Sequence, residues 1–137
     1  SNIASEAIAD DSLSEKQREE KVKAQLRLHF KPEFLNRIDE TIIFKQLTRE
    51  QIGNIVNYQV QMVQKRLADR KITLHLDASA LKFLSEKGYD PTFGARPLKR
   101  VIQDYLLNPL SKKILGDEIR SGSHVEVKAN KDGLTLQ

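Results

Sequence analysis

Residues 88–100 have the sequence GYDPTFGARPLKR, which predicts a stiff loop that leads directly into a helix. Gly88 lies where the preceding helix is expected to end, a position at which a positive φ is commonly needed. Asp90 precedes a proline and therefore favours a turn, because proline disfavours the α region for its neighbour. Gly94 permits close approach of the backbone, and Pro97 suits the first position of the next helix.

Arg96 lies at the junction between this loop and the next helix. Its guanidinium is permanently charged and planar and carries five hydrogen-bond donors. On a rigid loop, such a side chain is well suited to bind phosphate. The same position also suits a structural role, in which Arg96 caps a helix or forms a salt bridge nearby. The structural role is the commoner one for such an arginine, and the loop alone does not exclude it.

Outward from the loop, hydrophobic periodicity predicts a small α+β unit over residues 47–137, with a sheet of about three strands. A capping box at Thr48 and Gln51 begins a long helix. Leu115, near the end of the last predicted helix, is expected to face inward. Short helices are expected before Gly88, after Pro97 and from Asn108 to Gly116, and strands over residues 72–76, 124–128 and 134–136.

Residues 1–46 form a second and less complete region. Residues 1–11 are small, polar and acidic, and we expect them to be poorly ordered. A capping box at Ser14 and Gln17 then begins a charged helix that carries one apolar stripe.

A second arginine of interest comes after Pro32. Phe34 and Ile38 can be buried on one side of a short helix, which leaves Arg37 pointing elsewhere. Pairing with a local acid is the ordinary interpretation of such an arginine, and surface pairs of this kind contribute little. Residues 41–44, TIIF, predict a buried strand, but no other part of this region supplies a partner strand for it.

Composition excludes several classes of site. The 137 residues contain no cysteine, so disulfides and thiolate zinc sites are impossible. The three histidines, His29, His75 and His124, lack metal-ligand spacing, and we expect no metal site. No apolar run approaches the roughly 20 residues of a membrane span, so we expect a cytoplasmic protein, or one of the mitochondrial or plastid matrix.

The net charge is +4 overall, and residues 47–137 alone carry +5. A mildly basic surface tolerates a polyanionic ligand but does not demand one. Modules that bind nucleic acid usually show a denser basic patch with interleaved aromatic residues. The chain also lacks a Gly-x-x-x-x-Gly-Lys-Ser/Thr stretch, so it contains no P-loop to cradle a nucleotide.

Two long motifs nevertheless resemble segments of one family. Residues 30–40, FKPEFLNRIDE, resemble the arginine-finger segment of Clp-type AAA+ ATPases, and residues 88–100 resemble their sensor-2 segment. The two segments stand in the family's order and at about its spacing. GYDP at 88–91, NPL at 108–110 and ILG at 114–116 are most similar to the ClpB-type disaggregases within this family.

The resemblance implies that residues 1–46 are the C-terminal tail of a large subdomain in the second AAA+ module. Residues 47–137 would be the helical small subdomain, or lid, of the same module. By the family pattern Arg37 is the arginine finger, which reaches the γ-phosphate held by the neighbouring subunit.

The lid residues take their implied roles from the same resemblance. Arg96 would be the sensor-2 arginine, which contacts the phosphates of ATP bound in its own subunit, and Gly94 and Ala95 would position it. Ile55 would pack near the adenine. A guanidinium in such a place neutralises charge that builds on the phosphoryl oxygens during transfer.

For the intact parent protein, the resemblance implies an ATP-hydrolysing chaperone of the stress response that uses ATP or ADP with Mg²⁺. Such a parent would be a homo-hexamer that threads aggregated or unfolded polypeptides, together with a DnaK-type chaperone system and without a nucleic-acid or membrane partner. The fragment lacks Walker A and Walker B motifs, so we expect it neither to hydrolyse ATP nor to bind it tightly.

Two alternatives remain open at the level of sequence. The first is the same region of a ClpC- or ClpA-type unfoldase that feeds a protease. The second is a basic helical module that binds nucleic acid or a partner protein, which only the +5 charge of residues 47–137 supports.

Overall fold

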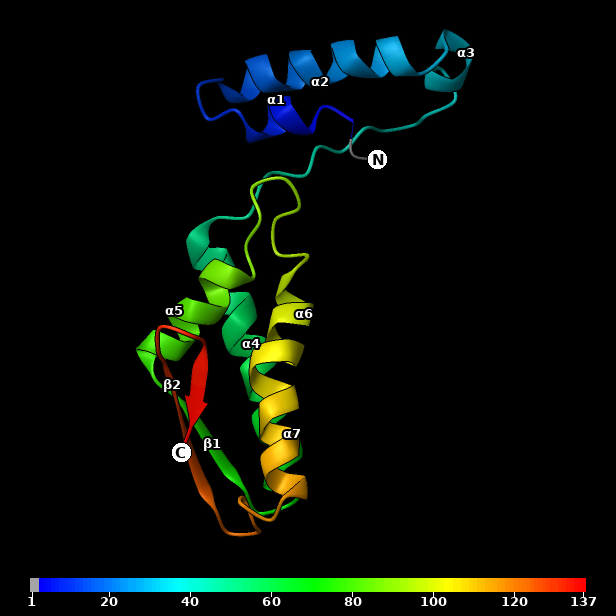
Figure 1. Cartoon of the computed structure of the whole chain (residues 1–137). Coiled ribbons are helices and arrows are strands. Elements are labelled where there is room, and N and C mark those ends of the chain that lie inside the picture. Colours follow the sequence, from blue (N-terminus) through cyan, green and yellow to red (C-terminus); the bar gives the residue numbers. More distant parts are fainter. Residues whose placement is uncertain (1–2) are drawn as a thin grey trace. The chain divides into compact units, whose positions relative to one another are not determined.

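Figure 1 shows a computed structural model of the chain, which describes residues 3–137. The chain divides into two compact units, residues 1–46 and residues 47–137. The first unit contains α1 (Ser5–Ala9), α2 (Glu15–His29) and α3 (Pro32–Leu35). The second contains α4 (Arg49–Ala68), β1 (Thr73–Leu76), α5 (Ala78–Lys87), α6 (Leu98–Ile102), the π-helical turn η1 (Gln103–Leu107), α7 (Asn108–Leu115), β2 (His124–Ala129) and β3 (Leu134–Leu136).

In the first unit, α1 packs beside α2. The prediction of poor order over residues 1–11 is wrong for residues 5–9, which form α1, and for residues 1–2 it lies outside the described residues. The Arg18 guanidinium donates to the Asp10 carbonyl at 3.0 Å, and this bond ties the turn between the two helices to α2. The capping box is confirmed, because the Ser14 hydroxyl and the Gln17 side chain each accept a bond from the other residue's backbone N–H.

The predicted strand over residues 41–44 is wrong. These residues have no regular secondary structure, and Ile42 and Phe44 are 68% and 83% exposed. A strand needs hydrogen-bonded partners, and this unit supplies none. The predicted burial of Phe34 is also wrong, since it is 51% exposed; its ring packs tilted against Phe30, with ring centres 4.9 Å apart.

The second unit places its helices against one face of a three-stranded sheet (Figure 1). β1 pairs with β2 in parallel, and β2 pairs with β3 in antiparallel register. A parallel pair requires a long connection, which α5, α6, η1 and α7 provide. The predicted α+β fold with about three strands is therefore confirmed.

An aliphatic core joins the sheet to α4, α5 and the α6–α7 stretch. Its fully buried members include Ile52, Val56, Leu84, Leu106, Val125 and Val127. Alternation on β2 explains the pattern, because Val125 and Val127 face the core while His124 and Lys128 face outward. The capping box at Thr48 and Gln51 is confirmed as the start of α4.

α7 begins at Asn108, as predicted, but Asn108 is not an N-cap, because residues 98–115 form one continuous helical stretch. Asn108 has helical torsion angles (φ −65°, ψ −48°), and its N–H donates to the carbonyl of Gln103, five residues back. Pro109 has no N–H to donate, and the wider π-helical turn before it accommodates the missing bond. Leu115 is 86% exposed, so the prediction that it faces inward is also wrong.

Candidate functional site

The loop after α5 begins at Gly88, which caps that helix through a bond from its N–H to the Leu84 carbonyl at 2.9 Å. The predicted positive φ at Gly88 is wrong, because its φ is −83°. Glycine is needed there for space instead: a Cβ would lie 2.4 Å from Leu98 Cδ1. The end of α5 and the start of α6 therefore pack too closely for a side chain.

Residues 90–94 form a tight hairpin that is braced from within. Asp90 and Gly94 exchange two backbone hydrogen bonds, of 2.8 and 2.7 Å. The Asp90 carboxylate accepts bonds from the N–H groups of Thr92 and Phe93, both at 2.8 Å. Gly94 has a φ of +63° and open space around its Cβ position, so it serves the turn rather than the predicted close approach.

Arg96 is exposed and lies between this hairpin and α6, which begins one residue later than predicted, at Leu98. Its guanidinium carbon is 5.3 Å from the centre of the Phe93 ring, a cation–π contact. Within residues 3–137 it forms no salt bridge. The structural interpretation of Arg96 as half of an ion pair thus finds no support in this chain.

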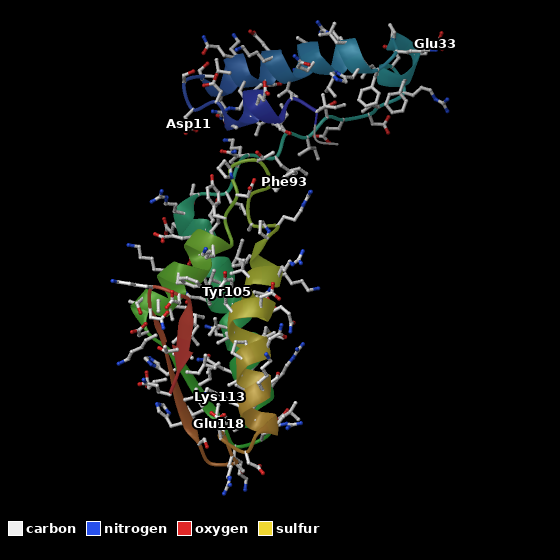
Figure 2. All side chains as sticks on the ribbon, viewed as in Figure 1. Asp11, Glu33, Phe93, Tyr105, Lys113 and Glu118 are labelled. Carbon is white, nitrogen blue, oxygen red and sulfur yellow. The ribbon has the colours of Figure 1, made fainter. Side chains whose placement is uncertain are left out.

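The surroundings of Arg96 are basic. Lys99 and Arg100 come next on α6, and both are exposed. The closest approach of Arg100 to an acid is 3.8 Å, from its Nε to the Asp104 carboxylate. Figure 2 shows Phe93 at the hairpin, beyond the start of α6. An aromatic face thus holds Arg96 while its charge stays available to an anion.

The other residues implied for the lid lie close to the core. Ala95 is half-buried and packs against it, as does Ile55 on α4. A cavity of about 460 Å³ lies near the start of α4 and is lined by Arg49, Ile52, Lys82, Ser85, Glu86 and Tyr89. Sequence reasoning missed this cavity because two stretches far apart in sequence, residues 49–52 and 82–89, contribute its lining, and no local pattern joins them.

Arg37 belongs to the first unit and comes after α3. Its N–H donates to the Phe34 carbonyl at 3.1 Å, and its side chain is exposed. The local pairs expected with Glu33 or Asp39 do not form within the described residues. Arg37 therefore presents a second guanidinium that no acid within residues 3–137 neutralises.

Two histidines that are far apart in sequence meet on the outer face of the sheet. His75 Nδ1 and His124 Nε2 each lie 2.9 Å from an oxygen of the Glu126 carboxylate. Bonding to His75, and then to His124, lowers the pKa of Glu126. No group of three or more His, Cys, Asp or Glu side chains in residues 3–137 is arranged to hold a metal ion.

The fold of residues 47–137, with the loop at 88–100 between α5 and α6, is that of the small (lid) subdomain of AAA+ proteins. Residues 47–127 match a family described as the C-terminal, D2-small domain of ClpB protein. The chain belongs to this ClpB D2-small family. Within the described residues, no helix combines the length and apolar character needed to cross a membrane.

Similar proteins extend the match to the whole chain. The chaperone protein ClpB of Bdellovibrio bacteriovorus is 50% identical over 136 residues, which cover 99% of this chain and 16% of that protein. ClpB of Meiothermus ruber is 51% identical over 140 residues, with coverage of 100% and 16%. Among solved structures, the S. cerevisiae Hsp104:casein complex in its extended conformation superposes with a TM-score of 0.77, at 32% identity, and covers 100% of this chain and 25% of that one.

Proposed function

We propose that this chain is the nucleotide-sensing C-terminal part of an ATP-dependent protein disaggregase. Residues 1–46 would be the tail of the large AAA+ subdomain, and residues 47–137 the lid. The observation that carries the proposal is the unpaired guanidinium of Arg96 on an internally braced loop, inside the region that matches the ClpB family.

The residues around Arg96 fit the phosphates of ATP. The arginine has no carboxylate partner among residues 3–137, and its basic neighbours Lys99 and Arg100 raise the local positive potential. A guanidinium in this setting donates bidentate hydrogen bonds to phosphoryl oxygens. When bound with Mg²⁺, ATP supplies the phosphoryl group whose transfer drives the parent protein.

The loop residues assist Arg96 indirectly. Gly94 sets the sharp turn before it, and Ala95 anchors the turn to the core. Ile55, half-buried on α4, offers an aliphatic surface of the kind that packs on an adenine ring. These residues position the nucleotide-facing arginine and the base, and none of them carries out chemistry.

Arg37 is proposed to act across a subunit boundary as an arginine finger. Its exposed side chain is free of acid partners within the described residues. A finger must reach out of its own subunit, so an exposed and unneutralised arginine is what this role requires. Its target would be the γ-phosphate of ATP held by the adjacent subunit.

The activity belongs to the intact parent, because the chain spans only 16% of the length of its ClpB relatives. We propose a cytoplasmic homo-hexamer that draws aggregated or unfolded polypeptides through its ring, together with a DnaK-type chaperone system. The solved neighbour was captured with casein, a polypeptide, which supports a polypeptide substrate. The isolated fragment is proposed to lack ATPase activity.

The test is an Arg96→Ala substitution in the full-length parent, with the first AAA+ module inactivated. We expect ATP hydrolysis to fall roughly tenfold or more, because a cation that stabilises the transferring phosphoryl group is lost. Arg27→Ala is the control, since it removes an exposed arginine of α2 that is given no role toward the nucleotide. Wild-type hydrolysis in the Arg96→Ala protein would refute the sensor role.

A further inference from the structure

A shallow groove runs between α4 and α7, and we call it the α4–α7 groove. Its volume is about 350 Å³, and its lining residues are Val63, Arg66, Leu67, Arg70, Leu107, Leu110, Ser111, Ile114 and Leu115. It lies at the end of the second unit opposite the 90–94 hairpin (Figure 1). The groove is therefore separate from the nucleotide-facing loop, and a role for it is independent of the function proposed for Arg96.

The floor of the groove is apolar. Val63, Leu67 and Leu110 are buried beneath it, and Ile114 is half-buried. Leu115 stands at the edge with 86% of its surface exposed. Single exposed leucines are common, but this one continues an apolar hollow.

The position of Leu115 is fixed by the end of α7. Gly116 caps that helix through its N–H, which donates to the Lys112 carbonyl at 2.9 Å. Lys113 pairs with Glu118 at 2.6 Å, which closes the turn after the helix (Figure 2). Leu115 is thus an exposed apolar side chain on a regular helix and not part of a loose loop.

Two arginines line the other side of the groove. Arg66 lies in the last turn of α4 and Arg70 in the turn that follows it, and both line the groove. Neither forms an ion pair within residues 3–137. Among the described residues, no carboxylate lines the groove, and its uncharged polar lining residue is Ser111. The groove therefore combines an apolar floor with an unneutralised positive edge.

We infer that the α4–α7 groove docks a short, acidic, amphipathic helix of a partner polypeptide. Its leucine-like side chains would fill the apolar floor, and its carboxylates would pair with Arg66 and Arg70 in bidentate geometry. Two helices form the walls, and their backbone groups are already hydrogen-bonded, so an extended strand would gain no main-chain bonds here. From Leu107 to Leu115 the wall is about 12 Å long, enough for about two helical turns.

The test uses the 137-residue chain and a fluorescein-labelled probe helix of about 14 residues, built from leucine and glutamate at helical spacing and stapled to keep it folded. Fluorescence anisotropy measures binding. We expect saturable binding that weakens with added salt, because charge pairs contribute to it. A probe with lysine in place of glutamate should bind at least roughly tenfold more weakly.

Substitutions in the chain then locate the site. Leu115→Asp, and separately the pair Arg66→Glu and Arg70→Glu, should each weaken the glutamate probe at least roughly tenfold. The charge-reversed pair should bind the lysine probe better than the unaltered chain does. Matched controls on α2 are Leu28→Asp, at a leucine that is 79% exposed, and Arg27→Glu, and neither should change binding.

Any one of the following outcomes would overturn the inference. The first is no binding of the glutamate probe, or binding that Leu115→Asp leaves unchanged while circular dichroism shows the variant folded. The second is equal affinity for the lysine probe. The third is a dimer of the chain in sedimentation that Leu115→Asp dissociates and the probe does not compete with, which would assign the groove to a second copy of the chain.

Discussion

Leu98 occupies the space that a β-carbon at Gly88 would need, so the two ends of the loop pack in direct contact. The added Cβ would lie 2.4 Å from Leu98 Cδ1 and 2.9 Å from the Leu84 carbonyl oxygen. Leu98 is only 2% exposed and has little room to move. We therefore expect Gly88→Ala to lower the free energy of unfolding by about 1–3 kcal/mol, measured by denaturant titration.

Gly53→Ala is the matched control for that substitution. Gly53 lies within α4, and a Cβ there would meet nothing within 4 Å. Alanine is the better helix former, so this variant should gain about 0.5–1 kcal/mol. Equal stability of the Gly88→Ala chain and the unaltered chain would show that the loop relaxes freely around the new methyl group.

Gly94 is required for its backbone conformation and not for space. A Cβ there would meet nothing within 4 Å, but its φ is +63°. Gly94→Ala should cost about 1–2 kcal/mol in the hairpin, since alanine is disfavoured in the left-handed region. Asparagine tolerates that region better, so Gly94→Asn should cost less. Amide hydrogen exchange at Thr92 and Phe93 reports the change, and identical protection in both variants would contradict it.

The two glycines show how far sequence reasoning reaches. The local pattern predicts that both positions require glycine, but it assigns the positive φ to Gly88 and the close approach to Gly94. In the structure Gly88 is required for space and Gly94 for its torsion angle. A pattern of turn residues shows that a glycine is required. Only the packed structure shows whether a neighbouring side chain or the backbone torsion imposes the requirement.

The same division holds for the rest of the chain. The capping boxes at Ser14 and Thr48 depend on residues three positions apart, and the sequence predicts both. The strand predicted over residues 41–44 is wrong because a strand depends on partners that are not local. A motif identifies Arg96, but its contact with Phe93 is visible only in the folded chain.

Asp77 provides a test of pH dependence. Its carboxylate accepts bonds from the Ser79 hydroxyl at 2.6 Å and the Ala80 N–H at 2.9 Å, and these bonds lower its pKa. A lowered pKa means that folding favours the ionised form. The stabilisation is therefore complete above the unfolded pKa, near about 4, and is lost as the pH falls through the lower folded value.

Asp77→Asn should reduce this acid sensitivity, because asparagine also caps a helix but does not titrate. Thermal midpoints measured from about pH 6 down to about pH 2 should fall less steeply in the variant than in the unaltered chain. Glu126 also has a lowered pKa, so part of the fall of the thermal midpoint with decreasing pH will remain in the variant. Parallel curves for the two proteins would show that Asp77 contributes nothing to the acid transition.

Phe93 should act as a positioning residue for Arg96, if the proposed function holds. An exposed cation–π contact contributes about 0.5–1 kcal/mol, so Phe93→Ala in the parent should weaken hydrolysis roughly two- to fivefold. Phe93→Tyr keeps an aromatic face and should restore most of the activity. A merely structural role would change unfolding but leave kcat and KM for ATP intact, so both kinetic constants are measured alongside thermal unfolding.

The trans role of Arg37 can be tested by mixing subunits of the parent, with the first AAA+ module inactivated. One subunit type carries Arg37→Ala with an intact P-loop, and the other carries an intact Arg37 with an inactive P-loop. Neither should hydrolyse ATP alone. In a ring with head-to-tail boundaries, random equal mixing pairs an intact finger with an intact P-loop at roughly a quarter of the boundaries.

We therefore expect the mixture to recover up to about a quarter of the parent's ATPase rate, because only those boundaries hold a complete site. Arg27→Ala, at an exposed arginine of α2, is the control and should hydrolyse ATP alone at the parent's rate. If the mixture is no more active than the sum of its separate components, Arg37 does not complete a neighbour's site. If Arg37→Ala subunits are active alone, no finger is needed, and the exposed guanidinium has another use.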